Sequence, residues 1–329
     1  NAATSAAPQE LLVSEGQTEP TYTPSDVLTY GTTYFWRIDE VNGAPDYTAF
    51  KGNVWSFTVE TFAYPIRNII ATSNAASGEM QGPENTVNGS GLNADDKHSI
   101  ETTDMWLVGP SAETVYIQYE FDNVYKLHEM LVWNYNVPFE PLLGFGLKDV
   151  TIEYSENGAD WTVWGDVQFA QATARSDYSA NTTVDLGGIA ARFVKIVIRS
   201  GYGLLGQYGL SEVRFLFVPV VAREPRPADG AADVAVDATL RWRAGRGAAM
   251  HQVHLSPDEA AVAEGAALAD TVADASYTPP DLHLATTYFW KIDEVDEADP
   301  AGTWSGQVWS FTTQEFLVVD DFEAYTDDE

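Results

Sequence analysis

The sequence contains no cysteine, few basic residues and no long apolar run. The absence of cysteine among its 329 residues excludes disulfides, thiol catalysis, iron–sulfur clusters and thiolate zinc sites. Lysine and arginine total 17 against 49 aspartates and glutamates, and this net charge of −32 would repel phosphate backbones and anionic membranes. The longest apolar stretches fall far short of the roughly 20 residues that a membrane-spanning helix needs. These absences argue against nucleic acid and membrane insertion, and leave divalent cations, basic partners and neutral glycans as candidate ligands.

The apolar content is sufficient for several domain cores. Apolar residues make up 45 % of the chain, and its length predicts two or three domains at roughly 150 residues each. The sequence opens at Asn1 without a basic and apolar signal region. We therefore expect either a mature product or a piece of a longer chain.

An internal repeat organises the sequence. Residues 34–41 (YFWRIDEV) recur as residues 288–295 (YFWKIDEV), and residues 54–58 recur unchanged as residues 308–312 (VWSFT). Both pairs lie 254 residues apart, so the spacing inside the repeated unit is kept. Apolar and polar residues alternate with a period of two in each copy, which predicts strands.

The approach to each repeated strand carries a family resemblance. Residues 28–34 and 284–288 resemble the tyrosine corner of fibronectin type III-like sandwiches. In that motif a tyrosine near the start of a strand hydrogen-bonds back to the preceding connection. The resemblance implies that Tyr34 and Tyr288 make this bond.

The two copies differ in completeness. Further strand patterns precede the second copy at residues 238–242 and 252–255, whereas the first copy begins at about the equivalent of Ser256. The sequence therefore predicts a partial fibronectin III-like domain at residues 1–62 and a complete one at residues 220–314. A partial sandwich leaves unpaired edges and an uncovered apolar face.

The segment between the copies also has the patterns of a β-sandwich. Alternating runs lie at residues 115–121, 150–154 and 213–217, and no long segment has helical periodicity. Asn157-Gly158 predicts a hairpin turn in which both residues have positive φ. We therefore expect a larger all-β domain at residues 63–219.

Five motifs in order give this middle segment a resemblance to the discoidin, or coagulation factor 5/8 type C, family. They are residues 84–89 (ENTVNG), 117–121 (IQYEF), 150–161 (VTIEYSENGADW), 191–196 (ARFVKI) and 210–215 (LSEVRF). The resemblance implies a jelly-roll sandwich like that of many bacterial carbohydrate-binding modules. The whole arrangement is similar to regions of large secreted planctomycete-type proteins, with residues 315–329 as an acidic tail or the start of a next module.

The discoidin resemblance also implies a structural calcium ion at the first long loop. Hard cations prefer six to eight oxygen ligands, and the matching positions offer Asn88, Asp95, Asp96 and Glu212. Asn88 stands where the family usually has aspartate, so one charge is lost. The alternative is that these residues are ordinary turn residues and solvated acids.

The same resemblance places a glycan site on loops at one end of the sandwich, where a ring stacks on a sugar and polar groups fix its hydroxyls. The candidate ligand-binding residues are His98, Trp133, Asn134, Asn136, Glu140, Phe145, Tyr202 and Tyr208, with Tyr135, Phe139 and Gln207 nearby. The basic residue that the family often places here is missing from these candidates, which disfavours acidic sugars. The alternative for each residue is a role in the core or in loop packing.

No motif predicts catalysis. His-Glu-x-x-His, Gly-x-Ser-x-Gly and P-loop patterns are absent from the sequence. The acidic pair Asp39-Glu40 recurs as Asp293-Glu294, and a duplicated pair favours loop or edge chemistry over a unique active site. We therefore expect a protein that is not an enzyme.

Two hypotheses for function follow. The first is an extracellular or cell-surface adhesion protein whose central domain binds a polysaccharide or a surface glycan. The second is a structural subunit that joins copies of itself head to tail into a filament. In that case the apolar run at residues 316–319 would supply strands to the partial first domain of a neighbour.

Overall fold

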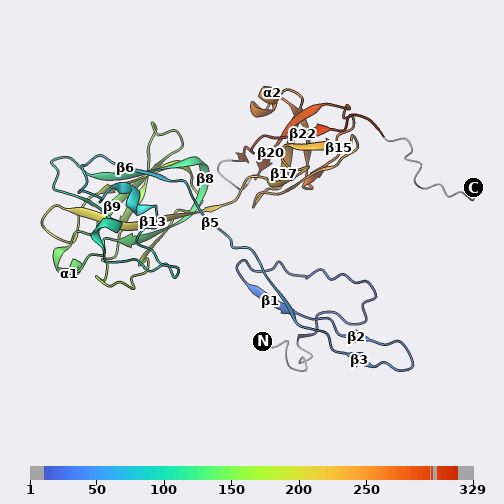
Figure 1. Ribbon diagram of the computed structural model, residues 1–329, viewed down its shortest axis with the longest axis horizontal. Coiled ribbons are helices and arrows are strands. Elements are labelled where there is room, and N and C mark those ends of the chain that lie inside the picture. Colours follow the sequence, from blue (N-terminus) through green and yellow to red (C-terminus); the bar gives the residue numbers. More distant parts are fainter. Residues whose placement is uncertain (1–10, 297, 299–301, 318–329) are drawn as a thin grey trace, which may run out of the picture. The chain divides into compact units, whose positions relative to one another are not determined.

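The computed structural model describes residues 11–296, 298 and 302–317, and strands dominate its regular structure (Figure 1). Its α-helices are a single turn, α1 (Glu140–Leu143), and the short α2 (Glu259–Ala263). The predicted all-β fold class is confirmed. Most of the predicted acidic tail, residues 318–329, lies outside the described residues. The chain divides into two compact units, Asn1–Tyr64 and Pro65–Glu329.

The first unit contains two antiparallel strand pairs. Strand β1 (Thr33–Trp36) pairs with β4 (Trp55–Thr58), and β2 (Glu40–Val41) pairs with β3 (Ala49–Phe50). The rings of Trp36 and Trp55 contact each other on the β1–β4 pair, yet both residues are close to half exposed. An aromatic face without cover is what the sequence predicts for a sandwich that lacks its first strands.

In the second unit, the central region is built around one long strand. Its strands are β5 (Tyr64–Pro65), β6 (Ile70–Ser73), β7 (Trp106–Val108), β8 (Tyr116–Asn134), β9 (Asp149–Ser155), β10 (Thr162–Gln168), β11 (Thr182–Asp185), β12 (Ala190–Ile198) and β13 (Tyr208–Val218), with 3-10 turns at Pro83–Thr86 and Thr102–Asp104. The first half of β8 pairs with β6 and β12, and its second half pairs with β11 and β13. All nine strands are thereby joined through β8.

Alternation along β8 builds the core of this region. Ile117, Tyr119 and Phe121 are buried on one side of the strand. The Phe215 ring of β13 packs edge-on against both Tyr119 and Phe121, at centroid distances of 5.2 and 5.1 Å. Edge-to-face aromatic pairs contribute beyond the area that they bury. This core fixes the strand ends from which the loops extend.

The predicted β9–β10 hairpin is confirmed, but its turn differs from the prediction. Six residues, 156–161, connect the strands, and positive φ is found at Gly158 and not at Asn157. The Asn157 side chain instead accepts hydrogen bonds from the backbone N–H groups of Ala159 and Asp160 at 2.8 and 2.9 Å. Asparagine here closes the turn through its side chain.

The C-terminal part contains a three-stranded and a six-stranded sheet. Its strands are β14 (Arg223–Arg226), β15 (Ala231–Val234), β16 (Leu240–Arg243), β17 (Met250–Ser256), β18 (Leu268–Val272), β19 (Ser276–Tyr277), β20 (Thr287–Val295), β21 (Thr303–Trp304) and β22 (Trp309–Thr313). Trp242, Trp290 and Trp309 lie together in its core. The fibronectin III assignment and the domain boundaries stay predictions.

The bond implied by the tyrosine corner is present in both copies of the repeat. The Tyr34 hydroxyl accepts a hydrogen bond from the Thr29 backbone N–H at 3.0 Å, and the Tyr288 hydroxyl accepts one from the His283 N–H at 3.1 Å. Each tyrosine thereby fixes the connection that leads into its strand.

The duplicated aspartates anchor loops, as the repeat predicted. Asp39 Oδ1 accepts the Gly52 backbone N–H at 3.1 Å, and Asp293 Oδ1 accepts the Gly306 N–H at 3.0 Å. Both glycines approach a neighbouring carbonyl so closely that a Cβ atom would lie about 2 Å from it. The motif is therefore a structural device of the repeat.

Candidate functional site

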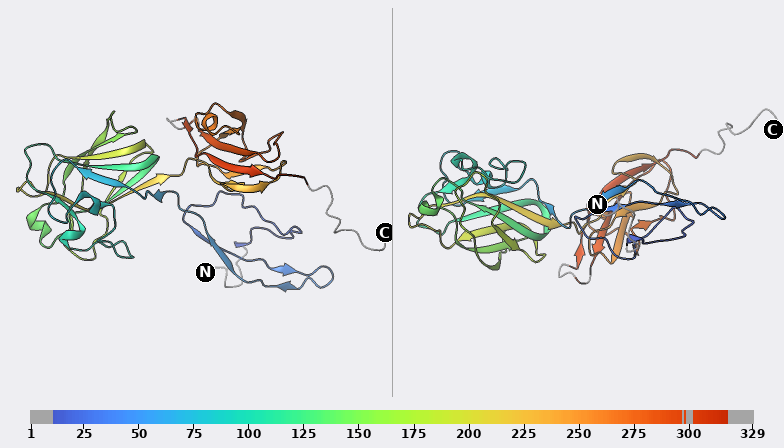
Figure 2. Two further views of the ribbon diagram at one scale, coloured as in Figure 1. Left: turned by 45° about the horizontal axis from the view of Figure 1, so that its top comes forward. Right: turned by 90° about the horizontal axis from the view of Figure 1, so that it is seen from below.

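Three connections lie next to one another at the end of the central sandwich that carries α1 (Figures 1 and 2). They are residues 135–148 after β8, 169–181 after β10 and 200–207 after β12, and we call them together the loop end. Hydrogen bonds join the first connection to each of the other two. The side chain of Gln171 donates to the Glu140 carbonyl at 3.0 Å, and the Gly203 N–H donates to the Gly144 carbonyl at 2.7 Å.

Asn134, the last residue of β8, holds two of these connections together. Its buried Nδ2 donates to the carbonyls of Leu147 and Ala170 at 2.7 and 2.9 Å. Its Oδ1 accepts the backbone N–H groups of Tyr135 and Leu147, both at 2.9 Å. The amide group therefore uses both donors and both acceptor positions inside the protein.

Glu140 holds the loop around α1 together through the hydrogen bonds of its buried side chain. Its carboxylate is buried and accepts the N–H groups of Phe145 and Gly146 at 3.1 and 2.8 Å. Burial raises the pKa of Glu140, and the two backbone donors oppose this effect. Its role is to shape the loop.

Two glycines allow the connections to approach each other at this end. Gly144 has a φ of 68°, and a Cβ atom there would lie 2.3 Å from the Gly203 nitrogen. A Cβ atom on Gly203 would lie 2.3 Å from the Leu143 carbonyl oxygen. Any larger residue at either position would separate the two connections.

Phe139 is the exposed aromatic residue of the loop end. It caps α1 in a left-handed conformation with a φ of 66°, and 72 % of the residue is exposed. Such a conformation is uncommon for a bulky residue, and positions of this kind cluster at ligand sites. The backbone is held by its carbonyl, which accepts the N–H groups of Leu142 and Leu143. A flat apolar ring therefore stands in solvent on a fixed loop.

Arg175 is a basic residue of the loop end that sequence reasoning missed. The Asn136 side chain donates to the Arg175 carbonyl at 2.7 Å, so this arginine lies beside the segment that carries Phe139. The Arg175 side chain is 72 % exposed and pairs with Asp177 at 3.3 Å. The sequence places no basic residue among the candidates themselves, and Arg175 comes beside them through the fold. The residue is about 40 positions from Asn136 in sequence, and only the fold brings the two together.

The eight predicted ligand-binding residues fall into two groups. Five are buried, namely His98, Trp133, Asn134, Asn136 and Glu140, and three are partly exposed, namely Phe145, Tyr202 and Tyr208. In this structure the buried five contact other protein groups and position the loops. Tyr202 also has a structural bond, because its hydroxyl donates to the Phe169 carbonyl at 2.7 Å.

The predicted calcium set does not form one cluster of possible ligands in the described residues. Both carboxylate oxygens of Asp96 accept hydrogen bonds from Arg214, at 2.8 and 2.9 Å, which lowers the pKa of Asp96. The Arg214 guanidinium in turn lies over the Trp133 ring. Asp95 is exposed, and the described residues contain no group of three or more histidines and acids arranged for a metal ion.

Asn88 and Glu212 do lie near each other. The buried Glu212 carboxylate accepts the Gly89 backbone N–H at 3.3 Å, directly after Asn88. Burial raises the pKa of Glu212 to about 7, and the charge of Asp96 contributes to this. A buried carboxylate beside a loop that offers carbonyl and amide oxygens is the kind of donor set that calcium prefers. Glu212 thus lies beside the Asn88 loop, and the described residues do not bring Asp95 and Asp96 into one cluster with it.

We expect the Glu212→Gln variant to be more stable than the natural chain above pH 7 in the presence of a chelator. Because the folded-state pKa of Glu212 is raised, the unfolded chain releases this proton near pH 4.5 and the folded chain near pH 7. The free energy of unfolding therefore falls as the pH rises through this window. The difference between the raised pKa of about 7 and the ordinary value of 4.5 corresponds to a loss of at most roughly 3 kcal/mol in the free energy of unfolding.

Calorimetric unfolding of both proteins at pH 4 and pH 8 measures this difference. The two should be equally stable at pH 4. Added calcium should raise the Tm of the natural chain at pH 8 and leave the variant unchanged. Equal stability at pH 8 in chelator would contradict the raised pKa, and no response of the natural chain to calcium would contradict the metal site.

None of the helices in the described part of the chain is long and apolar enough to cross a membrane.

Comparison with known proteins identifies the central region. Residues 68–210 match the F5/8 type C domain family. A search of curated proteins finds no match.

Three solved structures from Clostridium perfringens are similar to this part of the chain. CBM32-3 from a family 31 glycoside hydrolase is 17 % identical over 47 % of this chain and 95 % of its own, with a TM-score of 0.37. CpGH89CBM32-5, in complex with GalNAc-β-1,3-galactose, is 14 % identical over 46 % and 98 %, with a TM-score of 0.35. CpGH89 with its substrate GlcNAc-α-1,4-galactose is 10 % identical over 46 % of this chain, with a TM-score of 0.33. The chain spans only 14 % of the length of that enzyme. On the family match, residues 68–210 form an F5/8 type C, or discoidin-like, domain.

Proposed function

We propose that this chain is a non-catalytic, extracellular carbohydrate-binding protein whose glycan site lies at the loop end, with Phe139 as its stacking platform. The observation that carries the proposal is the exposed Phe139 ring on a loop fixed from within by Asn134 and Glu140. A pre-formed loop loses little conformational entropy when a ligand binds. A domain of the same family, CpGH89CBM32-5, is solved with a disaccharide.

The polar groups around Phe139 favour a neutral sugar. Arg175 is paired with Asp177, so the two charges cancel locally. The chain as a whole carries a net charge of −32, which opposes the approach of acidic glycans. GalNAc and GalNAc-β-1,3-galactose are therefore suitable first probes, followed by an array of neutral glycans.

Replacing Phe139 by alanine is expected to weaken glycan binding at least tenfold, which corresponds to about 1.4 kcal/mol. The ring is mostly exposed, so its loss removes stacking surface without opening a cavity. Isothermal titration of the full chain with the two probes, and with each hit from the array, measures the change.

Phe50→Ala is the matched control, because Phe50 is a 56 % exposed phenylalanine of the first unit. It should bind like the natural chain. Unchanged affinity of Phe139→Ala for every glycan that the natural chain binds would refute the site. Binding to no glycan on the array would refute the function.

We also propose that calcium, held by Glu212 and the Asn88 loop, has a structural role. The ion would offset the negative charge of the buried Glu212 carboxylate and fix the long loop that follows Asn88.

Self-assembly is the second candidate function, and the exposed rings of the first unit favour it. Trp36, Trp55 and Phe57 are each 44 to 46 % exposed, and together they form a contiguous apolar surface on β1 and β4. Strands from a second copy would cover this surface and pair with its edges.

A further inference from the structure

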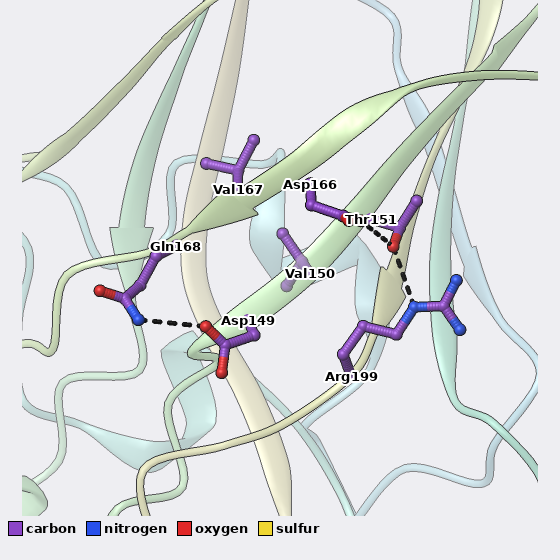
Figure 3. Close-up of a pocket in the computed structure, with 7 residues that line it drawn as sticks. All are labelled: Asp149, Val150, Thr151, Asp166, Val167, Gln168 and Arg199. Carbon is purple, nitrogen blue, oxygen red and sulfur yellow. Dashed lines mark hydrogen bonds between the residues drawn. The ribbon is translucent and has the colours of Figure 1, made fainter.

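A groove lined by both polar and apolar side chains lies on the side of the central sandwich, over strands β9 and β10 (Figure 3). It is open to solvent and has a volume of about 650 Å³, within the range of small-molecule sites. Its lining residues are Asp149, Val150, Thr151, Asp166, Val167, Gln168 and Arg199. We call it the side groove. None of the side chains that carry the proposed loop-end site lines it.

The buried hydroxyl of Thr151 orders the two charged groups of the side groove. It donates to Asp166 Oδ1 at 2.6 Å and accepts from Arg199 Nε at 2.9 Å (Figure 3). Within the described residues, neither Nη atom of Arg199 has a hydrogen-bond or ion-pair partner. A guanidinium whose orientation is fixed through Nε, with two free donor groups, is prepared for a ligand.

The other end of the groove supplies acceptors as well as donors. Asp149 accepts hydrogen bonds from the Ser200 hydroxyl at 2.5 Å and from Gln168 Nε2 at 3.1 Å. These bonds lower the pKa of Asp149, so it is a carboxylate at neutral pH. Gln168 is exposed and retains its amide oxygen as an acceptor.

The strand register places a row of side chains from four strands on the face of the sheet that carries the groove. Asp166 pairs with Thr151, Thr151 pairs with Val197, and Val197 pairs with Tyr116, so these four side chains share one face. The row crosses four strands, a span of roughly 14 Å at 4.8 Å per strand. The partly exposed Tyr116 ring stands at its far end. The row is therefore long enough for more than one sugar ring.

We propose that the side groove is a second carbohydrate site, which binds a segment of a neutral oligosaccharide chain. The two carboxylates and the single guanidinium leave one net negative charge, which disfavours anionic glycans. Neighbouring hydroxyls of a neutral sugar can donate to Asp149 and Asp166 and accept from Arg199, so both kinds of groove group are satisfied. This goes beyond the loop-end proposal, since it adds a separate set of residues and a requirement for chain length.

The test uses the full chain with soluble galactomannan, xyloglucan and mixed-linkage β-glucan as neutral probes and polygalacturonate as the acidic one. Affinity electrophoresis should show that Arg199→Gln and Asp166→Asn each weaken binding to the same neutral polysaccharide at least tenfold. Arg199→Lys should also weaken it, because lysine keeps the charge but loses the planar pair of donors. Arg67→Gln, which changes an exposed arginine outside the groove, is the matched control and should bind normally.

Each outcome decides between the two sites. If all the Arg199 and Asp166 variants bind normally, the side-groove proposal is overturned. It is also overturned if the natural chain prefers polygalacturonate and these variants abolish that preference. Phe139→Ala distinguishes the two proposals. If binding is lost only in Phe139→Ala, the result supports only the loop-end site. If binding is lost only in the Arg199 and Asp166 variants, it supports only the side groove. If none of these polysaccharides binds, the side-groove proposal fails, whereas the loop-end proposal is decided by its own titration with GalNAc, GalNAc-β-1,3-galactose and the glycan array. Circular dichroism confirms that each variant is folded.

Discussion

Replacing Trp290 by alanine is expected to lower the free energy of unfolding of the C-terminal part by about 3–5 kcal/mol. The same replacement at its repeat equivalent, Trp36, should cost less than about 1 kcal/mol, in the range of surface substitutions. Both rings contact a partner tryptophan at a centroid distance of 4.8 Å. They differ in cover, because Trp290 is fully buried while Trp36 is 45 % exposed. The pair therefore isolates the effect of the additional strands on one aromatic contact.

Hydrogen exchange followed by mass spectrometry suits this comparison, since each strand reports separately and the chain need not unfold in one step. Peptides of β20 should lose about a hundredfold or more of their protection in Trp290→Ala. Peptides of β1 should change little in Trp36→Ala. A large loss in β1 would show that the face of the first unit is covered in solution.

Sedimentation velocity over a range of concentrations then identifies the cover. Concentration-dependent association of the natural chain that Trp36→Ala abolishes would support assembly between copies. A monomer at all concentrations would contradict assembly, because the exposed Trp36 and Trp55 face would then have no neighbour to cover it.

The sequence was sufficient to predict the fold class and the internal chemistry of the repeat. Alternation at residues 117–121 correctly placed Ile117, Tyr119 and Phe121 in the core, because a period of two directs side chains to one face. The repeated spacing likewise predicted that Asp39 and Asp293 serve loops, and both accept a glycine N–H. Such local patterns need no knowledge of distant contacts.

The candidate site was harder to predict from the sequence, because it depends on distances between loops. Asn134 and Glu140 have the polar groups that a ligand requires, but the backbone already uses them. Asn134 bonds backbone groups of Leu147 and Ala170, and the Glu140 carboxylate accepts from Phe145 and Gly146. Arg175 is near Asn136 only through the fold. For the same reason Asp96 could not be distinguished from a calcium ligand until Arg214 was seen to hold it. The high exposure of Phe139, which distinguishes it from its buried neighbours, likewise became visible only in the fold.

Asn134→Leu is expected to be the most damaging change at the loop end. Leucine has a similar volume but none of the four hydrogen bonds that the buried amide makes with backbone groups of Tyr135, Leu147 and Ala170. Each backbone group left unpaired in the interior costs about 1–3 kcal/mol. We therefore expect a loss of at least about 4 kcal/mol and a Tm lower by roughly 10 °C.

The exposed Asn123 of the same strand provides the control, since Asn123→Leu makes the same chemical change outside the core. Its Tm should stay within about 2 °C of the natural chain, as surface substitutions do. Calorimetry gives both values, and glycan titration adds a second readout. Because Asn134 holds both ends of the connection that carries Phe139, at Tyr135 and Leu147, its loss should also abolish binding at temperatures where the strands remain folded. A variant with a lower Tm but normal glycan affinity would show that Phe139 is positioned without Asn134, and a normal Tm would show that the four bonds are replaced by others.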